Sequence, residues 1–317
     1  MRAWGRLLRI ALAPTALADV AAGVVLGAET WPLGLSFLAL LLASLSVYHG
    51  AMALNDWADR EWDAKTRPDR PIPAGDITPR AALTVALCLL ASAPAWTLLA
   101  ISPNWSHPAS IACVIATALS AVFAVAYDLG PRGAVLGPLL LATCRALNLS
   151  AGVFFGLSAT AAESAAPGIL ALLVIPAYAA YVFVVSRLGR LEDGESEEAL
   201  ARTPSRYCRR LAVLLGGVGS LACLRALLLE GELPSWEALL PLAIGLAGAS
   251  ALWKLARRTA WTRAHVIEAM GCALRRFLVF TACSALLVPG LAPAVVAALI
   301  LCGFPLSFWL RKVAPPS

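Results

Sequence analysis

Residues 33–55 read LGLSFLALLLASLSVYHGAMALN, and residues 56–75 continue as DWADREWDAKTRPDRPIPAG. The first stretch is largely apolar and matches the roughly 20 residues that a helix needs to cross a bilayer. The second stretch is rich in acidic side chains, basic side chains and proline. A spanning helix that runs directly into such a segment predicts a membrane protein with polar chemistry at one end of a helix.

The composition of the whole chain supports this fold class. Of its 317 residues, 60% are hydrophobic and 14% are charged, and the mean hydropathy is +0.78. Soluble domains carry about a quarter charged residues, so this chain has too few to coat a globule of its size. Long Ala- and Leu-rich runs favour helices over strands. We therefore exclude a soluble enzyme, a disordered protein and a β-barrel, and expect one all-α polytopic membrane domain over residues 1–317.

Ten apolar runs approach the length of a membrane span, and proline, glycine or charged residues separate them. We expect nine to ten transmembrane helices. The candidate spans are 8–28, 33–55, 80–101, 108–127, 135–155, 167–186, 207–229, 236–254, 266–289 and 291–310.

The distribution of Lys and Arg predicts the orientation of these spans. Arg2, Arg6 and Arg9 precede the first span, and the opposite loops contain no Lys or Arg. Because cytoplasmic loops collect basic residues, we expect a multi-pass protein of a bacterial inner membrane with its N-terminus and motif loops in the cytoplasm. The net charge of +6 then reflects topology, and we expect no nucleic-acid partner. The expected cytoplasmic segments are 56–80, 128–134, 187–206, 254–265 and 311–317.

Three aspartates define the first motif loop, 56–80. Asp56, Asp59 and Asp63 are spaced i, i+3 and i+7, so a continuing helix places them on one face. Asn55 lies one turn before Asp59 and adds a neutral oxygen. Three such carboxylates repel one another unless a cation lies between them, and their hard oxygen ligands suit Mg²⁺. We expect the three aspartates to be catalytic through a magnesium ion that Asn55 helps to bind.

Basic residues follow the aspartates in the same loop. Arg67 and Arg70 present planar groups that suit phosphate oxygens, and three prolines stiffen the segment. Acidic and basic groups clustered in this way predict one complex anion, held by metal on one side and arginine on the other. A diphosphate fits this description. The alternative is a solvated loop with surface ion pairs.

The order of these residues resembles a known family. N-D-x-x-D-x-x-x-D from Asn55 to Asp63, followed by R-P-x-R-P-I-x-x-G from Arg67 to Gly75, is similar to the first signature of the UbiA-type intramembrane prenyltransferases. The resemblance implies a horseshoe of about nine helices around a central cavity, and Mg²⁺-dependent transfer of a prenyl group from a prenyl diphosphate. It also implies that Arg67 contacts the diphosphate and that Arg132 lies near the substrates.

The second charged loop, 187–206, departs from the family pattern. The family has a second D-x-x-x-D motif after the sixth span, but residues 181–195 read YVFVVSRLGRLEDGE. Three explanations stay open. Glu192 and Asp193 bind a second Mg²⁺, or Arg187 and Arg190 replace that metal by binding phosphate directly, or the loop has no catalytic role.

This degenerate motif, together with the stretches Pro14–Asp19 and Arg145–Asn148, resembles a narrower branch. The branch is the prenyltransferase-like component of the bacterial ebo gene cluster, the EboC-like proteins. That resemblance implies a small or lipid-like acceptor, either an alcohol or polyol or an aromatic compound. A quinone precursor is the alternative acceptor class.

Three polar residues lie at membrane depth. Asp19 is in the middle of the first predicted span, and Arg145 and Asn148 share one face of the fifth. Buried ionisable groups cost at least ~2.5 kcal/mol each and usually face a cavity or a partner. We expect the three to line the acceptor pocket, or Asp19 and Arg145 to neutralise each other, and the two roles are compatible.

Two other function classes fit ten spans. A transporter of a polar or amphipathic metabolite would use buried groups such as Asp19 and Arg145, but transporters place their key groups near the midplane. The dense motif of this chain lies at helix ends, which favours the enzyme. A non-catalytic membrane scaffold is the third class.

Overall fold

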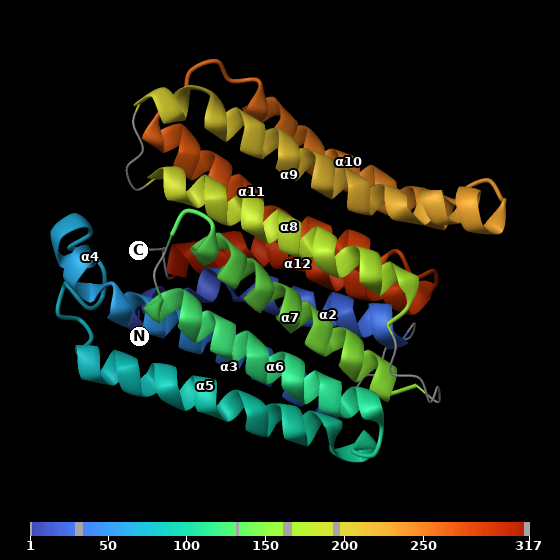
Figure 1. Ribbon diagram of the computed structural model, residues 1–317, viewed down its shortest axis with the longest axis horizontal. Helices are drawn as coiled ribbons and strands as arrows, with labels where there is room; N and C mark the ends of the chain where they lie inside the picture. Colours follow the sequence, from blue (N-terminus) through green and yellow to red (C-terminus); the bar gives the residue numbers. More distant parts are fainter. Residues whose placement is uncertain (1, 29–33, 131–132, 161–166, 193–196, 314–317) are drawn as a thin grey trace.

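The computed structural model describes residues 2–28, 34–130, 133–160, 167–192 and 197–313, and every regular element in these ranges is helical (Figure 1). This arrangement confirms the expected all-α fold. The helices are α1 (Arg2–Leu7), η1 (Ile10–Leu12), α2 (Ala13–Ala28), α3 (Leu35–Ala58), α4 (Arg60–Thr66), α5 (Pro79–Ile101), η2 (Ser102–Asn104), α6 (Pro108–Leu129), α7 (Leu136–Ser158), α8 (Ile169–Gly189), η3 (Arg190–Glu192), α9 (Glu197–Arg225), η4 (Ala226–Glu230), α10 (Trp236–Ala256), α11 (Arg263–Ala285) and α12 (Leu291–Val313).

Within the described ranges, nine helical segments are long and apolar enough to cross a membrane. Helix α11 has the length of a span and runs along the others, but Glu268, Arg275 and Arg276 interrupt its apolar sequence. The expectation of nine to ten spans is therefore met. Figure 1 places α4 and both chain termini at the same end of the bundle.

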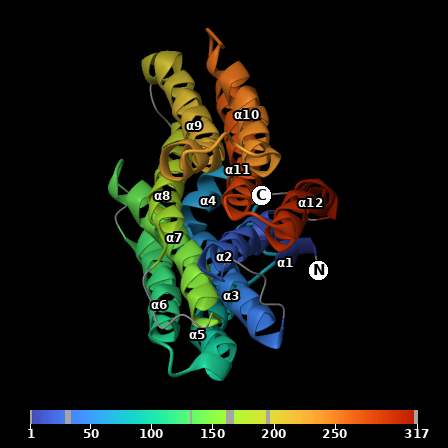
Figure 2. The same cartoon turned by 90° about the vertical axis from the view of Figure 1, so that its right-hand side faces the viewer.

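Helix α2 lies in the middle of the bundle, and the pair α9 and α10 lies at its edge (Figure 2). Of the most apolar 18 residues in the span Ile10–Ala28, which contains α2, 78% are buried inside the protein. The corresponding share for the span formed by α10 is 28%. Helix α2 packs on α3, α7, α11 and α12, whereas α10 packs on α9 and α11. In a membrane, the outer face of the α9–α10 pair would border lipid.

Four glycines bring α2 and α7 into backbone contact. A Cβ atom built on Gly23 would lie 2.2 Å from the Leu149 carbonyl oxygen, and one on Gly152 would lie 2.4 Å from the Val20 oxygen. Gly27 and Gly156 repeat the pattern one turn further along each helix. Such small residues four apart let helices approach closely where van der Waals packing drives association in lipid.

Two predicted boundaries are wrong. The predicted span 8–28 is not continuous, because α1 ends at Leu7 and Arg9 adopts a left-handed backbone with φ 48°. The predicted loop 187–206 is mostly helical, because α8 extends to Gly189 and α9 begins at Glu197. In both places hydropathy marks only the apolar length of a helix. It carries no information about charged turns or about backbone that leaves the helical conformation.

Candidate active site

The first motif lies at the junction of α3 and α4. Asn55 and Asp56 are in the last turn of α3, and Asp63 is in α4. Helix α4 ends at Thr66, since a residue that precedes proline disfavours the helical conformation. Arg67, which precedes Pro68, accordingly has φ −144° and ψ 62°. The chain then turns back toward α4.

Arg70 lies between two aspartates as a result of this turn. Its Nη1 donates to Asp63 Oδ2 at 2.6 Å and to Asp56 Oδ1 at 3.4 Å. All three side chains are buried, with 8% of Arg70, 2% of Asp56 and 1% of Asp63 exposed. The remaining oxygens, Asp56 Oδ2 and Asp63 Oδ1, are buried and have no hydrogen-bond donor in the described part of the chain.

Burial raises the pKa of the Asp63 carboxyl above its usual range. The positive charge of Arg70 and its hydrogen bond act in the opposite direction, and the negative charges of Asp59 and Asp56 add to the rise. A carboxylate in this position gains from any further cation that reaches its second oxygen.

Arg9 is a second cation at this site, and sequence reasoning attributed it only to topology. Its Nη2 donates to Asp56 Oδ1 at 3.0 Å and to Asn55 Oδ1 at 3.3 Å. The left-handed turn at Arg9 is tied to α3, because Tyr48 donates its hydroxyl proton to the Arg9 carbonyl at 3.1 Å. His49 Nδ1 is 2.8 Å from the Leu8 carbonyl. The interruption of the first predicted span therefore directs a guanidinium group at the motif.

Asp128 is a second site residue that the sequence analysis missed. Asn55 Nδ2 donates to Asp128 Oδ1 at 3.0 Å, and Asp128 is buried near the end of α6. This contact fixes the orientation of the Asn55 amide, whose oxygen then faces Arg9. The available signal was an acidic residue directly after the fourth predicted span, 108–127.

The two charged loops meet at Arg67. Its Nη2 lies 3.7 Å from Glu192 Oε1, and Arg263 Nε donates to the backbone carbonyl of Glu192 at 2.6 Å. Glu192 therefore joins α4 to η3 and α11. Arg190 is half-buried in the same short turn, and Asp59 is half-buried at the α3–α4 junction.

The other predicted basic residues are placed differently. Arg187 Nε donates to the Tyr207 hydroxyl at 3.1 Å, and its Nη1 donates to the Ala134 carbonyl. These bonds tie α8 to α9 and to the start of α7. Arg132 and Asp193 lie outside the described residues.

The described residues contain no group of three or more His, Cys, Asp or Glu side chains arranged to hold a metal ion. Arg70 pairs with two of the three motif aspartates, Asp56 and Asp63, and the third, Asp59, lies near enough to raise the pKa of the Asp63 carboxyl. The donor set still suits Mg²⁺. Asp56 and Asp63 each present one buried oxygen without a donor, and hard oxygen ligands are those that Mg²⁺ prefers.

The model of the UbiA prenyltransferase family matches residues 16–274. The chain belongs to the UbiA prenyltransferase family. The match extends from the first span through most of α11 and includes both charged loops.

Relatives of this UbiA-family protein match it over limited stretches. It is 38% identical over 122 residues to the bacteriochlorophyll synthase 33 kDa chain of Cereibacter sphaeroides. The matched residues make up 37% of this chain and 36% of that relative. It is 56% identical over 55 residues to the digeranylgeranylglyceryl phosphate synthase of Methanothrix thermoacetophila. The matched residues make up 16% of this chain and 21% of that relative. The matches span about a third and about a fifth of these two relatives.

Solved structures share the fold along nearly the whole chain. A UbiA homolog from Archaeoglobus fulgidus bound to GPP and Mg²⁺ aligns with a TM-score of 0.57 at 15% identity, covering 98% of this chain and 99% of that one. A second structure, of a digeranylgeranylglyceryl phosphate synthase in membranes, aligns with a TM-score of 0.56 at 16% identity. The alignment covers 89% of this chain and 97% of that one. At this identity the likeness concerns the fold.

A second polar cluster lies inside the helical bundle of this UbiA-family protein. Asp19 is fully buried, and Arg145 Nη2 lies 3.1 Å from its Oδ2. Asn148 Nδ2 donates to the same oxygen at 3.3 Å, and Tyr178 donates its hydroxyl proton to Asp19 Oδ1. Arg145 also donates to the Tyr178 oxygen at 2.9 Å and lies over the Phe277 ring. The sequence predicts that Asp19, Arg145 and Asn148 lie together, whereas no local pattern marks Tyr178 as a fourth member of the cluster.

This cluster satisfies the charges of both ionisable residues. The carboxylate receives donors from two neighbouring helices, α7 and α8, so the interpretation that Asp19 and Arg145 neutralise each other fits the geometry. Arg145 retains 13% exposure of its side chain. The cluster therefore ties α2, α7 and α8 together, and a small part of the Arg145 side chain stays exposed.

Proposed function

We propose that this protein transfers a prenyl group from a prenyl diphosphate to an acceptor in the membrane, with Mg²⁺ as cofactor. The observation that carries the proposal is the buried pair Asp56 and Asp63 beside Arg9, Arg67 and Arg70 at one end of the bundle. Carboxylates for a metal and arginines for phosphate oxygens meet there, in a chain of the UbiA prenyltransferase family. Relatives named as synthases and a homolog bound to GPP and Mg²⁺ add support.

The residues that would hold Mg²⁺ are Asp56, Asp63, Asp59 and Asn55. When bound there, the ion would stabilise negative charge on the departing diphosphate. Arg70 currently neutralises the two buried carboxylates. A metal at these oxygens would take over that role and release the guanidinium for phosphate oxygens.

The arginines around the motif would bind and orient the diphosphate. Arg67 and Arg70 present planar donors that suit phosphate oxygens. Arg67 pairs weakly with Glu192 at 3.7 Å, and substrate phosphate would compete for that guanidinium. We extend the same role to Arg132 and Arg190, and Arg9 joins the set because it already reaches Asp56.

For the second loop, Glu192 is the acidic residue that fits a role beside the diphosphate, since it contacts Arg67. It would bind a second metal together with Asp193. The bonds of Arg187 to Tyr207 and Ala134 support a positioning role for that arginine instead of direct phosphate binding.

The chemistry needs no nucleophile from the protein. The C–O bond between prenyl C1 and the diphosphate breaks, the acceptor atom forms a bond to C1, and the acceptor proton leaves to the diphosphate or a nearby carboxylate. Arginines that stabilise the leaving group lower the barrier to ionisation, and apolar helix faces shield the allylic cation from water.

The acceptor class we favour is a hydroxyl-bearing, lipid-like molecule, as in the ebo-cluster branch. A relative named for glyceryl phosphate is 56% identical over 55 residues, while the relative named for bacteriochlorophyll keeps an aromatic or pigment-like acceptor as the alternative. We place the accessible side of Arg145, with Asp19 and Asn148 behind it, at the wall of the acceptor pocket. The basic end of the bundle would face the cytoplasm at a bacterial inner membrane.

A transporter is the rival from another class. The buried cluster around Asp19 would suit one, but its charges are mutually satisfied. Asp56 and Asp63, each with an oxygen that lacks a donor among the described residues, lie instead at the end of α3 and in α4. This placement favours chemistry at a membrane surface over passage through the midplane.

The test is diphosphate release by purified protein in lipid nanodiscs. Labelled geranyl, farnesyl and geranylgeranyl diphosphates are supplied with Mg²⁺ and candidate alcohols or aromatic acceptors. We expect release that falls by about 10²–10³-fold in Asp56→Asn and Asp63→Asn, because transition-state charge is then poorly stabilised. Asp69→Asn is the matched control, since Asp69 is exposed in the same loop, and its rate should stay within about two-fold of wild type.

Two results would refute the proposal. One is the absence of release from every chain length in wild type, together with no effect of Asp59→Ala. The other is uptake of a solute into sealed vesicles that depends on Asp19 but not on Asp56, which would establish the transporter.

A further inference from the structure

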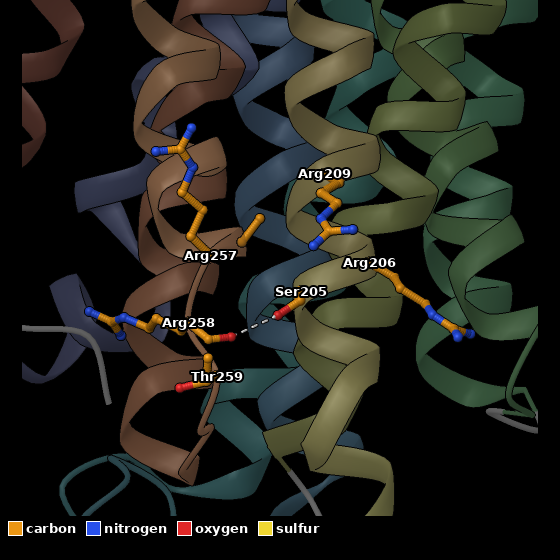
Figure 3. A pocket seen from close by; sticks show the side chains of 7 residues that line it. Ser205, Arg206, Arg209, Arg257, Arg258 and Thr259 are labelled. Atoms are coloured by element: carbon orange, nitrogen blue, oxygen red, sulfur yellow. Dashed lines mark hydrogen bonds between the residues drawn. The ribbon is translucent and has the colours of Figure 1, made fainter.

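A basic pocket lies between the ends of α9 and α10, apart from the motif aspartates. Its volume is about 440 Å³. Figure 3 shows the side chains that line it, including Ser205, Arg206 and Arg209 from α9, and Arg257, Arg258 and Thr259 from the chain after α10. None of the residues that line it is acidic.

Three of its four arginines have no carboxylate within ion-pair distance among the described side chains, which do not include those of residues 193–202. They are Arg206, Arg209 and Arg257, and all three are exposed. Arg258 differs, because its two terminal nitrogens donate to Glu268 at 2.7 and 3.2 Å. In Figure 3 Arg209 lies between the two helices, and Arg206 points away from Arg257 and Arg258. The pocket therefore carries an excess of positive charge that no described carboxylate balances.

The floor of the pocket is held by hydrogen bonds. Ser205 Oγ donates to the Arg258 carbonyl at 3.3 Å and accepts from Trp261 Nε1 at 2.8 Å. The ion pair of Arg258 with Glu268 then ties the same turn to α11. The chain between α10 and α11 is thus fixed against α9, and the exposed arginines project from a supported wall.

The position of the pocket indicates its ligand. The apolar spans of the two helices are Thr203–Leu228 and Trp236–Ala256, so Ser205 to Arg209 and Arg257 to Thr259 lie where these spans meet the head groups. The α9–α10 pair is at the edge of the bundle (Figure 2), where its neighbours in a membrane are lipids. Basic pockets between spans at this depth bind anionic head groups.

We infer that this pocket binds the phosphate group of an anionic membrane lipid. Guanidinium groups of Arg209 and Arg257 contact the phosphate oxygens, and Arg206 adds to the local positive potential. The acyl chains of the lipid lie along the outer face of α9 and α10. Binding here requires neither the motif aspartates nor a prenyl diphosphate, so it stands apart from the proposed activity.

The test is lipid binding by native mass spectrometry of the purified protein. Phosphatidylglycerol is titrated as the anionic probe, and phosphatidylcholine is the neutral comparison. We expect the double variant Arg209→Gln, Arg257→Gln to weaken phosphatidylglycerol binding by about 25-fold, at about five-fold per arginine near the surface. Phosphatidylcholine binding should not change.

The matched control is the double variant Arg210→Gln, Lys254→Gln. It removes the same charge from exposed positions on the same two helices, outside the pocket lining. Equal weakening of lipid binding in both double variants would overturn the inference, because it would show general charge attraction. Displacement of the lipid by inorganic phosphate at equal concentration would also overturn it, because the site would then take a free anion.

Discussion

The close contact of α2 and α7 predicts a large penalty for one added methyl group. A Cβ atom on Gly23 would lie 2.2 Å from the Leu149 oxygen, where ordinary contact begins at 3.4 Å. The two backbones must therefore separate by about 1.2 Å in Gly23→Ala, since neither atom belongs to a side chain that can rotate away. Overpacking of this kind costs about 1–3 kcal/mol.

The separation would also stretch the polar contacts that cross the same helix pair. Asn148 and Arg145 on α7 reach Asp19 on α2 at 3.3 and 3.1 Å, and an added 1.2 Å or so exceeds hydrogen-bond distance. We expect the thermal midpoint in detergent to fall by about 2–12 °C, taking about 2–4 °C per kcal/mol.

Gly217→Ala is the matched control for this experiment. Gly217 is exposed on α9, and a Cβ atom there meets nothing within 4 Å. Alanine also favours a helix over glycine by up to about 1 kcal/mol, so this variant should unfold at the wild-type temperature or slightly above. Midpoints for Gly23→Ala and Gly217→Ala within about 2 °C of each other would refute the packing argument.

Three further predictions concern the polar clusters. Arg9→Gln should lower stability by about 1–3 kcal/mol because buried Asp56 loses its nearest cation. Added Mg²⁺ should restore the thermal midpoint of this variant. A midpoint that Mg²⁺ does not change would contradict metal binding at Asp56. Burial raises the pKa of Asp63, although Arg70 acts to lower it. As the pH decreases, the Mg²⁺ affinity measured by calorimetry should therefore begin to fall at a higher pH than it would for an aspartate with an ordinary pKa. A Mg²⁺ affinity that stays unchanged down to about pH 4 would count against Asp63 as a ligand. Tyr178→Phe removes a hydrogen bond to a buried carboxylate and should cost about 1.5–3 kcal/mol without changing the Mg²⁺ requirement, as chemical denaturation and a Mg²⁺ titration would show.

Local patterns predicted the helices and the first motif well. The apolar run into Asn55 ends where α3 ends, within a few residues, because burial in lipid demands a fixed length of apolar helix. The spacing of Asp56 and Asp63 predicted that the two lie on one face, and in the structure they share Arg70 across the α3–α4 junction. These features depend on residues that are close in the sequence.

Contacts between distant segments account for what was missed. Arg9 is 47 residues from Asp56 along the chain, and Asn55 is 73 from Asp128. No local periodicity connects such positions, and a basic residue before a first span already has an explanation in membrane topology. The sequence pattern assigned Arg70 to phosphate. Its contact with Asp63 depends on how the proline-rich loop packs, and local sequence patterns do not predict that packing.

The short helix α1 has a practical consequence for handling the protein. Its Leu7 is fully buried, and Arg6 donates to the backbone carbonyl of Asp69 within the motif loop. An affinity tag fused directly to the N-terminus would therefore sit a few residues from the groups that would bind substrate. Kinetic comparisons of variants are best made with a cleavable N-terminal tag, since a residual peptide there would change the very rates being compared.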